Sequence, residues 1–258
     1  MKDKLLMDTA VLAGEIMLSS GAETYRVEDT MNHILRTSKR QSIDVLALMT
    51  GIVATINDEE MQQPITAVKA IHKRSTNLNN IIKVNEISRS YCGGNLSLEE
   101  AYASLKNVKE KLYGRVVFNF ATVLVTTGFA MMFGGRAVDV FAAALAGVWL
   151  AVCLMFANVT HMSTILTDIA STAGIAMLIM SLQAFLIPGI STDIAIVSTI
   201  MPLVPGVAIT NAVRDVLHRD YLSGCARILE SFLKAGSIAI GVGIGMALFR
   251  IVLGGVLR

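Results

Sequence analysis

Charged residues are scarce in this chain of 258 residues, and most of those present lie in its first 115 positions. They make up 16% of the sequence, whereas soluble domains carry about 25%. The shortage falls on residues 116–258, where long apolar runs take the place of charges. A soluble protein of buried helices needs more polar surface than this part supplies. We therefore predict a soluble domain over residues 1–112 and a membrane-embedded domain over residues 113–258.

Cysteine and histidine are also rare. Cys92, Cys153 and Cys225 lie far apart, with neither the spacing of a metal site nor that of a disulfide framework. The four histidines are equally dispersed, so no catalytic triad or zinc site can be assembled from spacing. We expect no catalytic residue, no metal and no cofactor, and therefore no enzyme. A net charge of +2 without basic and aromatic residues interleaved argues against nucleic acid as a partner.

No cleavable signal peptide is visible, because Asp8 and Glu15 interrupt any apolar core within the first twenty residues. The first long apolar run begins only beyond residue 115. We therefore expect the N-terminal domain to be made in the cytosol before the chain enters a membrane.

The N-terminal domain has the pattern of an α+β fold. Helical periodicity predicts helices over residues 4–19, 24–38 and 77–91. The apolar, β-branched residues 42–56 predict a hairpin that turns at Thr50 and Gly51, and residues 65–72 predict another strand. Ser97 and Glu100 have the spacing of a capping box, which predicts a further helix running to Leu112 and straight into the membrane.

The second half predicts an α-helical integral membrane protein. A bilayer core of about 30 Å needs about 20 apolar residues in a helix. Five segments meet this requirement, so we expect about five transmembrane helices; they cover residues 116–133, 138–156, 169–187, 194–213 and 235–253. Gly241, Gly243 and Gly245 give the last span a smooth face typical of close helix packing.

The orientation follows from basic residues in the short loops. The flank of the first span and the loop between the fourth and fifth spans are rich in them; they are Lys106, Lys109, Lys111, Arg115, Arg214, Arg219, Arg227 and Lys234. With five spans, both regions lie on one side, which the rule makes cytoplasmic. We expect a multi-pass protein of the inner or plasma membrane with a cytoplasmic N-terminal domain and a C-terminus outside.

The fourth span carries a group of unusual residues. Pro202 and Pro205 lack amide hydrogens and Gly206 loosens the chain, so a continuous helix is not expected here. A helix that restarts at Gly206 would aim free amides into a cavity, where they suit a carboxylate. The polar residues nearby complete the candidate substrate site; they are Thr210, Asn211, Arg214, Asp215 and, at the start of the third span, Asp168.

Each of these candidates has a simpler alternative. The two prolines can be a structural kink with polar residues at the cytoplasmic boundary. Asp168 can carry a proton or face the substrate path, or it can be an interfacial acid in water. We expect Arg214 to attract anions to the entrance, or to pair with an acid such as Asp168.

A second dense group of polar side chains lies in residues 20–28. Glu23, Tyr25, Arg26 and Glu28 can form a polar network at a helix start, or they can be a solvated turn and helix face.

Three motifs in this order resemble those of the threonine/serine exporter family. The first is the Gly-Ala-Glu-Thr-Tyr-Arg-Val-Glu sequence that ends at Glu28; the second covers residues 83–89 and 96–101; the third runs from Pro202 to Asp215. The resemblance covers nearly the whole chain. It implies the longer subunit, with the soluble domain and five spans, of the members that are split into two chains. The second membrane half of the long members is missing.

The resemblance implies secondary active export of a small carboxylate-bearing solute, either an amino acid like threonine or serine or a dicarboxylate such as succinate. It implies as partners the membrane lipid and a smaller membrane subunit of the same family, a homo-oligomer, or both. Two other functions stay open on the residues alone. One is a regulatory or scaffolding membrane subunit, and the other is a membrane-anchored enzyme acting through its N-terminal domain.

Overall fold

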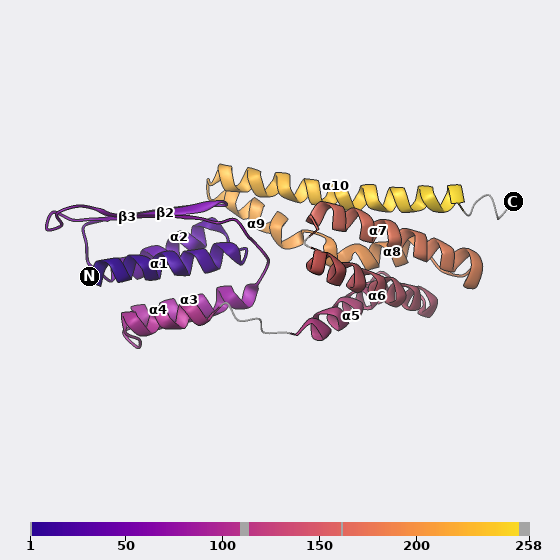
Figure 1. Ribbon diagram of the computed structural model, residues 1–258, viewed down its shortest axis with the longest axis horizontal. Coiled ribbons are helices and arrows are strands. Elements are labelled where there is room, and N and C mark those ends of the chain that lie inside the picture. Colours follow the sequence, from indigo (N-terminus) through magenta and orange to yellow (C-terminus); the bar gives the residue numbers. More distant parts are fainter. Residues whose placement is uncertain (1, 109–113, 161, 253–258) are drawn as a thin grey trace. The chain divides into compact units, whose positions relative to one another are not determined.

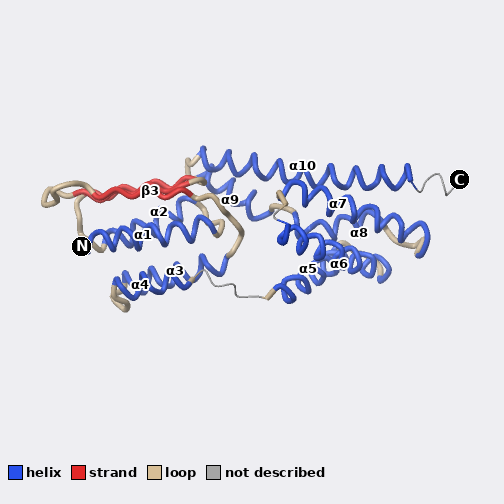
Figure 2. The backbone as a smooth tube through the Cα atoms, viewed as in Figure 1, coloured by secondary structure: helices blue, strands red, loops and turns tan. Residues whose placement is uncertain are grey.

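Helices make up most of the chain, and three short strands lie within its N-terminal part (Figures 1 and 2). The computed structural model describes residues 2–108, 114–160 and 162–252. Contacts divide the chain into two units. The first comprises Met1–Lys111 and Gly206–Leu229, and the second comprises Leu112–Pro205 and Glu230–Arg258.

The sheet of the first unit is antiparallel, with strand order β1-β2-β3. Its strands are β1 (Ser42–Leu48), β2 (Gly51–Asn57) and β3 (Ile65–Ala70). Leu48 pairs with Gly51, so Met49 and Thr50 form the turn between the first two strands. The predicted hairpin and the predicted third strand are therefore confirmed.

Four helices build the layers below this sheet (Figure 2). The helices α1 (Lys2–Ser19) and α2 (Thr24–Arg36) pack against one face of the strands. On the other side of α1 lie α3 (Leu78–Cys92) and α4 (Leu98–Asn107). One apolar core joins the layers, and its largest fully buried members include Ile16, Met17, Met31, Leu35 and Ile52.

The capping box at the start of α4 is present. The Ser97 hydroxyl accepts a hydrogen bond from the Glu100 amide at 3.2 Å, and the Glu100 carboxylate accepts one from the Ser97 amide at 2.8 Å. The helix ends at Asn107 with Val108 as its C-cap. The continuation that the sequence predicted, to Leu112 and into the membrane, lies outside the described residues, as does the predicted boundary between residues 112 and 113.

The second unit is a bundle of apolar helices. It contains α5 (Arg115–Met132), α6 (Ala137–Thr160), α7 (Thr164–Ser181), the π-helical turn η1 (Leu182–Leu186), α8 (Thr192–Ile200) and the 3-10 turn η2 (Met201–Leu203). Most of α10 (Tyr221–Val252) belongs to it as well. Helix α6 packs against α5, α7 and α8, and its residues Ala142 and Ala146 lie in the core of the bundle.

Three helical segments among the described residues are long and apolar enough to cross a membrane: α6, Thr164–Leu186 and α10. A fourth is added if α8 with η2 and α9 (Gly206–Leu217) are counted as one broken span. Apolar residues Val116–Met132 of α5 form a shorter apolar helix. The mostly helical, membrane-type fold is therefore confirmed, whereas the count of five spans stays a prediction. The last residue of the fifth predicted span, Leu253, lies outside the described residues.

The bundle carries large apolar side chains on its outside. Several keep more than half of their surface exposed; among them are Phe118, Phe120, Phe141, Phe156 and Ile251. Soluble proteins rarely expose so extended an apolar surface to water. Such a surface is compatible with a lipid bilayer, because the lipid chains are as apolar as these side chains.

The glycines of α10 explain how it approaches α7 so closely. A Cβ atom at Gly241 would collide with backbone atoms of Ile169, and one at Gly245 with backbone atoms of Ala173. A Cβ at Gly243 has no heavy atom within 4 Å. The expected close packing is thus confirmed for Gly241 and Gly245, four residues apart, and their partner is a helix of the same chain.

Candidate functional site

Five consecutive residues of the first unit, 21–25, each meet a residue of α9 or of the segment that follows it. We call residues 21–25 the docking segment. They follow α1 and lead into α2, where Gly21 adopts a φ of +85° that lets the chain turn between the helices. The partners, in the same order, are Asn211, Arg227, Arg214, Asp215 and His218.

The first two contacts use backbone carbonyls. The Asn211 side-chain amide donates a hydrogen bond to the Gly21 carbonyl at 2.7 Å. The Arg227 guanidinium donates one to the Ala22 carbonyl, also at 2.7 Å. Ala22 is fully buried, so its carbonyl has no access to bulk water. Such a buried carbonyl needs a partner inside the protein, and Arg227 supplies it.

Glu23 carries the central negative charge of this contact. Its carboxylate lies 2.6 Å from the Arg214 guanidinium and 3.3 Å from that of Arg26. Burial raises the pKa of Glu23, but hydrogen bonds from its own amide and from Arg214, together with the charges of Arg26 and Arg214, outweigh it. The net pKa lies below the ordinary value of 4.5, so Glu23 is ionised at neutral pH.

A buried ion pair lies beside Glu23. The amide and the hydroxyl of Thr24 donate to one oxygen of Asp215, at 3.2 and 3.0 Å. The other oxygen lies 2.9 Å from the Arg227 guanidinium. Asp215 is fully buried and Arg227 is 6% exposed. Removing one member of such a pair leaves an uncompensated buried charge, which is strongly destabilising.

Further contacts extend this region. The Tyr25 and His218 rings stack in parallel with their centroids 4.0 Å apart. The Ser223 hydroxyl of α10 accepts a hydrogen bond from the Met49 amide at the tip of the β1–β2 hairpin, at 3.1 Å. Glu28 accepts one from the Ala47 amide at 2.9 Å. Of the two alternatives for residues 20–28, the structure has the polar network, and Glu23 is buried at 3% exposure rather than solvated.

The candidate residues of α9 fall into two groups. Asn211 and Asp215 are buried and bonded to the docking segment. Thr210 is exposed, and its hydroxyl donates to the Gly206 carbonyl one turn earlier at 3.0 Å. Arg214 is bound to Glu23 while its side chain stays 52% exposed. The acid that pairs with Arg214 is therefore Glu23, where the sequence suggested one such as Asp168.

The interruption of the fourth predicted span is present. The chain leaves α8 through η2, which contains Pro202, and Val204 takes an extended conformation before Pro205. A new helix, α9, begins at Gly206. A continuous helix is excluded here, as the two prolines predicted.

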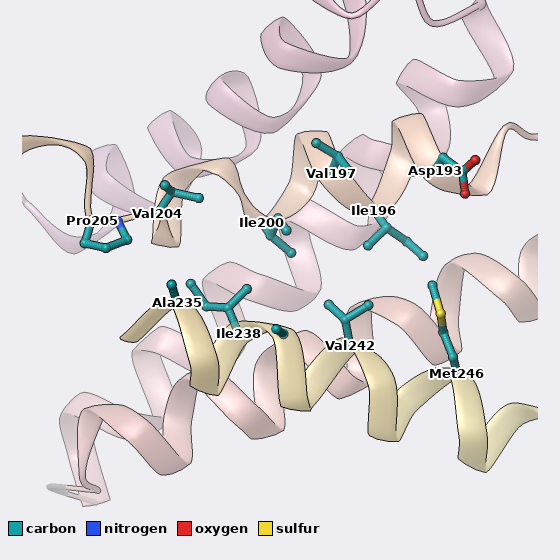
Figure 3. A pocket seen from close by; sticks show the side chains of 11 residues that line it. Asp193, Ile196, Val197, Ile200, Val204, Pro205, Ala235, Ile238, Val242 and Met246 are labelled. Carbon is teal, nitrogen blue, oxygen red and sulfur yellow. The ribbon is translucent and has the colours of Figure 1, made fainter. Parts of the chain in front are cut away.

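A cavity of about 560 Å³ lies between α8 and α10 within the second unit (Figure 3). Ile196 and Ile200 of α8 point toward Ile238 and Val242 of α10 (Figure 3). The lining is apolar except for Asp193 at one end. A carboxylate in this cavity would lose its hydration without gaining a hydrogen-bond donor from the lining side chains. The cavity therefore suits an apolar group and does not supply the expected carboxylate site.

Asp168 is buried near the start of α7, at 5% exposure, so it is not an acid in open water. The Lys234 ammonium of α10 acts on it electrostatically. One turn further along, the Thr172 hydroxyl reaches the Ile238 carbonyl of α10 at 3.3 Å. Asp168 thus belongs to the contact between α7 and α10.

The family model described as "Putative threonine/serine exporter" matches residues 8–249, which is nearly the whole chain. The chain belongs to this family. Searches of curated proteins and of solved structures found no match. Membership makes the chain a membrane protein of the exporter type, and the family is one of transporters rather than enzymes.

Two important residues of this exporter-family protein escaped the sequence reasoning. Thr24 lay inside the first motif but was passed over in favour of its charged neighbours. Arg227 was counted only as a basic loop residue, although it lies in α10 and is buried against Asp215. A signal was available, since a threonine at the start of a helix and an arginine between apolar neighbours both call for a partner. Sequence spacing alone could not name that partner.

Proposed function

We propose that this chain is the larger subunit of a two-component secondary exporter for a small solute that bears a carboxylate. The solute is an amino acid such as threonine or serine, or a dicarboxylate such as succinate. Five spans cross the membrane: α5, α6, α7 with η1, the broken pair α8 and α9, and α10. A smaller membrane subunit of the same family supplies the second half.

The interruption between α8 and α9 is the observation that carries this proposal. Irregular backbone at membrane depth is tolerated only where it faces protein or a water-filled cavity. The amides at the start of a helix are unpaired and favour a negative group by about 0.3–1 kcal/mol, and by more when partly buried. A helix that restarts at Gly206 therefore supports a carboxylate site at the break.

The residues take different roles in this proposal. Pro202, Pro205 and Gly206 keep the break open, and the exposed hydroxyl of Thr210 lies one turn into the new helix. Asn211 and Arg214 act from the same helix while bound to the docking segment, and the exposed half of Arg214 attracts anions. Asp168 is the acid proposed to carry a proton within the membrane half.

Flux into liposomes tests the proposal. The purified chain is reconstituted with and without the smaller subunit, and counterflow of labelled threonine, serine and succinate is measured. We expect flux of at least one of them that requires this chain. Absence of flux for all three, with the partner present, would contradict export of these solutes. If the smaller subunit alone gives the same flux as the two chains together, this chain is a regulatory or scaffolding subunit.

A double variant, Pro205→Ala with Gly206→Leu, tests the break itself. It restores one amide hydrogen and removes the flexible glycine. A Cβ at Gly206 has no heavy atom within 4 Å, so a side chain there starts into open space. We expect a loss of substrate binding and flux of about tenfold. Binding and transport equal to wild type would make the proline pair a structural kink only.

A further inference from the structure

Every residue of the docking segment is engaged by a different residue of α9 or of the segment after it. The five partners lie between Asn211 and Arg227, and each of them contacts one residue of the docking segment. In two of these contacts the docking segment contributes a backbone carbonyl, so they depend on its backbone path and not on its side chains. The hairpin tip adds a sixth contact, from Met49 to Ser223.

The partner region has a special place in the sequence. Gly206–Leu229 begins where the interrupted span restarts and ends inside α10, which continues as the next apolar helix. It contains α9, the turn at Arg219 and Asp220, and the first residues of α10. We call Gly206–Leu229 the junction. The junction is covalently continuous with α8 and η2 before it and with the rest of α10 after it. A movement of the junction would therefore be transmitted to both.

The chemistry of the contact favours one that stays closed. Opening it would separate Asp215 from Thr24 and Glu23 from Arg214. Because Asp215 is fully buried, such a separation would expose or strand a charge, and that is strongly unfavourable. A hinge that opens in every cycle would be built from weaker contacts.

We propose that the docking segment makes the N-terminal α/β layers a rigid handle on the junction. The handle positions the junction and moves with it as one body during transport. Thr24, Glu23, Asp215 and Arg227 are then positioning residues and do not touch the substrate. This inference rests on the proposed transport function, and it assigns the N-terminal layers a mechanical role.

Thr24 allows the cleanest test, because it is 1% exposed and cannot reach a solute. Thr24→Val keeps the shape and removes the hydroxyl donor to Asp215, whereas Thr24→Ser keeps the donor. Thr30→Val, at a buried threonine of the same helix outside the docking segment, is the matched control. Full-length variants are compared in liposomes for maximal flux, KM and equilibrium substrate binding.

We expect Thr24→Val to lower maximal flux about fivefold, the effect of one buried hydrogen bond. KM and substrate binding stay within twofold of wild type, and Thr24→Ser and Thr30→Val transport normally. A loss of affinity at unchanged maximal flux would overturn the proposal, because it would place the docking segment at the substrate. Unchanged flux in Thr24→Val would overturn it as well.

A cross-link tests the rigidity. In a chain whose three cysteines are replaced, Met49→Cys and Ser223→Cys, at the contact between the hairpin tip and the junction, are joined by a short bifunctional thiol reagent. We expect the joined protein to transport as fast as the same variant before joining. Flux that stops on joining and returns on release would show that the contact opens in each cycle, and the rigid handle would be wrong.

Hydrogen exchange separates this inference from the proposed function. In the full chain, Thr24→Val should speed amide exchange across the junction about fivefold, and Thr30→Val should leave the junction unchanged. This readout needs no transported solute. If wild type shows no flux but the exchange result holds, the transport function fails while the docking stands. Unchanged exchange in Thr24→Val would refute the docking whatever the flux.

Discussion

Gly21 shows how one residue can arrange a whole contact. Its positive φ turns the chain between α1 and α2 and leaves its carbonyl facing Asn211. A side chain at this φ is strained, and its Cβ would lie 3.4 Å from the Ser75 carbonyl oxygen. Because Gly21 makes the turn, the next residues reach Arg227, Arg214 and Asp215 in succession.

Glu28 offers a prediction about pH. Burial raises its pKa above the ordinary 4.5; the hydrogen bond from the Ala47 amide opposes this shift and repulsion by Asp220 adds to it. A raised pKa means that the stability Glu28 contributes is present below about pH 4.5 and is lost as the pH rises through the higher folded value. Glu28→Gln keeps an oxygen for Ala47 and carries no charge. It should therefore be more stable than wild type at pH 7–8 and unfold at a higher temperature there.

Thermal unfolding in detergent between pH 4 and 8 checks this. The difference between Glu28→Gln and wild type should shrink toward pH 4, where wild-type Glu28 becomes mostly protonated in both states. Glu86→Gln, at an exposed position of α3, is the matched control. A Glu28→Gln protein less stable than wild type at pH 8 would mean that the charge itself is needed at this position.

Single residues were also where sequence reasoning was weakest. It placed Glu23 and Arg214 in two separate candidate groups, although they lie 2.6 Å apart. They are 191 positions apart in sequence, and periodicity reports only on neighbours within a few turns or along one strand. The burial of Asp215 and Arg227 was missed for the same reason.

At the scale of single elements, the sequence was a much better guide. The hairpin, the capping box at Ser97 and the interruption at Pro202 and Pro205 are all present. Each is determined by local chemistry: a turn between apolar strands, a side chain capping its own helix, and missing amide hydrogens. The length of α4 beyond Asn107 lies outside the described residues.

The glycines of α10 give a prediction for one helix. Gly245→Leu places a large side chain against the backbone of Ala173, so it should destabilise the packing of α10 on α7 by about 1–3 kcal/mol or more. Gly243→Leu is the matched control, because its Cβ has no heavy atom within 4 Å. Thermal unfolding in detergent measures both variants, and light scattering gives their oligomeric size.

The two glycines separate packing within the chain from assembly. A Gly245→Leu protein as stable as wild type would contradict the contact between α7 and α10. A Gly243→Leu protein with wild-type stability but a smaller oligomer would place a second helix on this face of α10. That helix would belong to a second copy or to the smaller subunit that we propose.

At the scale of the molecule, the distribution of basic residues predicts the orientation. Lys106, Arg219 and Lys234 lie in regions that the positive-inside rule puts in the cytoplasm. Arg214 and Arg227 belong to the same regions, but both are engaged with acidic residues of the first unit. The rule counts basic residues rather than net charge, so these ion pairs leave the predicted orientation unchanged.

Cysteine labelling in intact cells provides this test of a cytoplasmic N-terminal domain and an outside C-terminus. Cys92, Cys153 and Cys225 are first replaced, and Gln62→Cys, at an exposed position between β2 and β3, is then introduced. An impermeant maleimide should label it only after the membrane is opened, because the basic flanks predict that residues 1–112 lie on the cytoplasmic side. Arg258→Cys should be labelled in intact cells. Ready labelling of position 62 in intact cells would invert the orientation, and labelling of neither position would place both ends inside and exclude five spans.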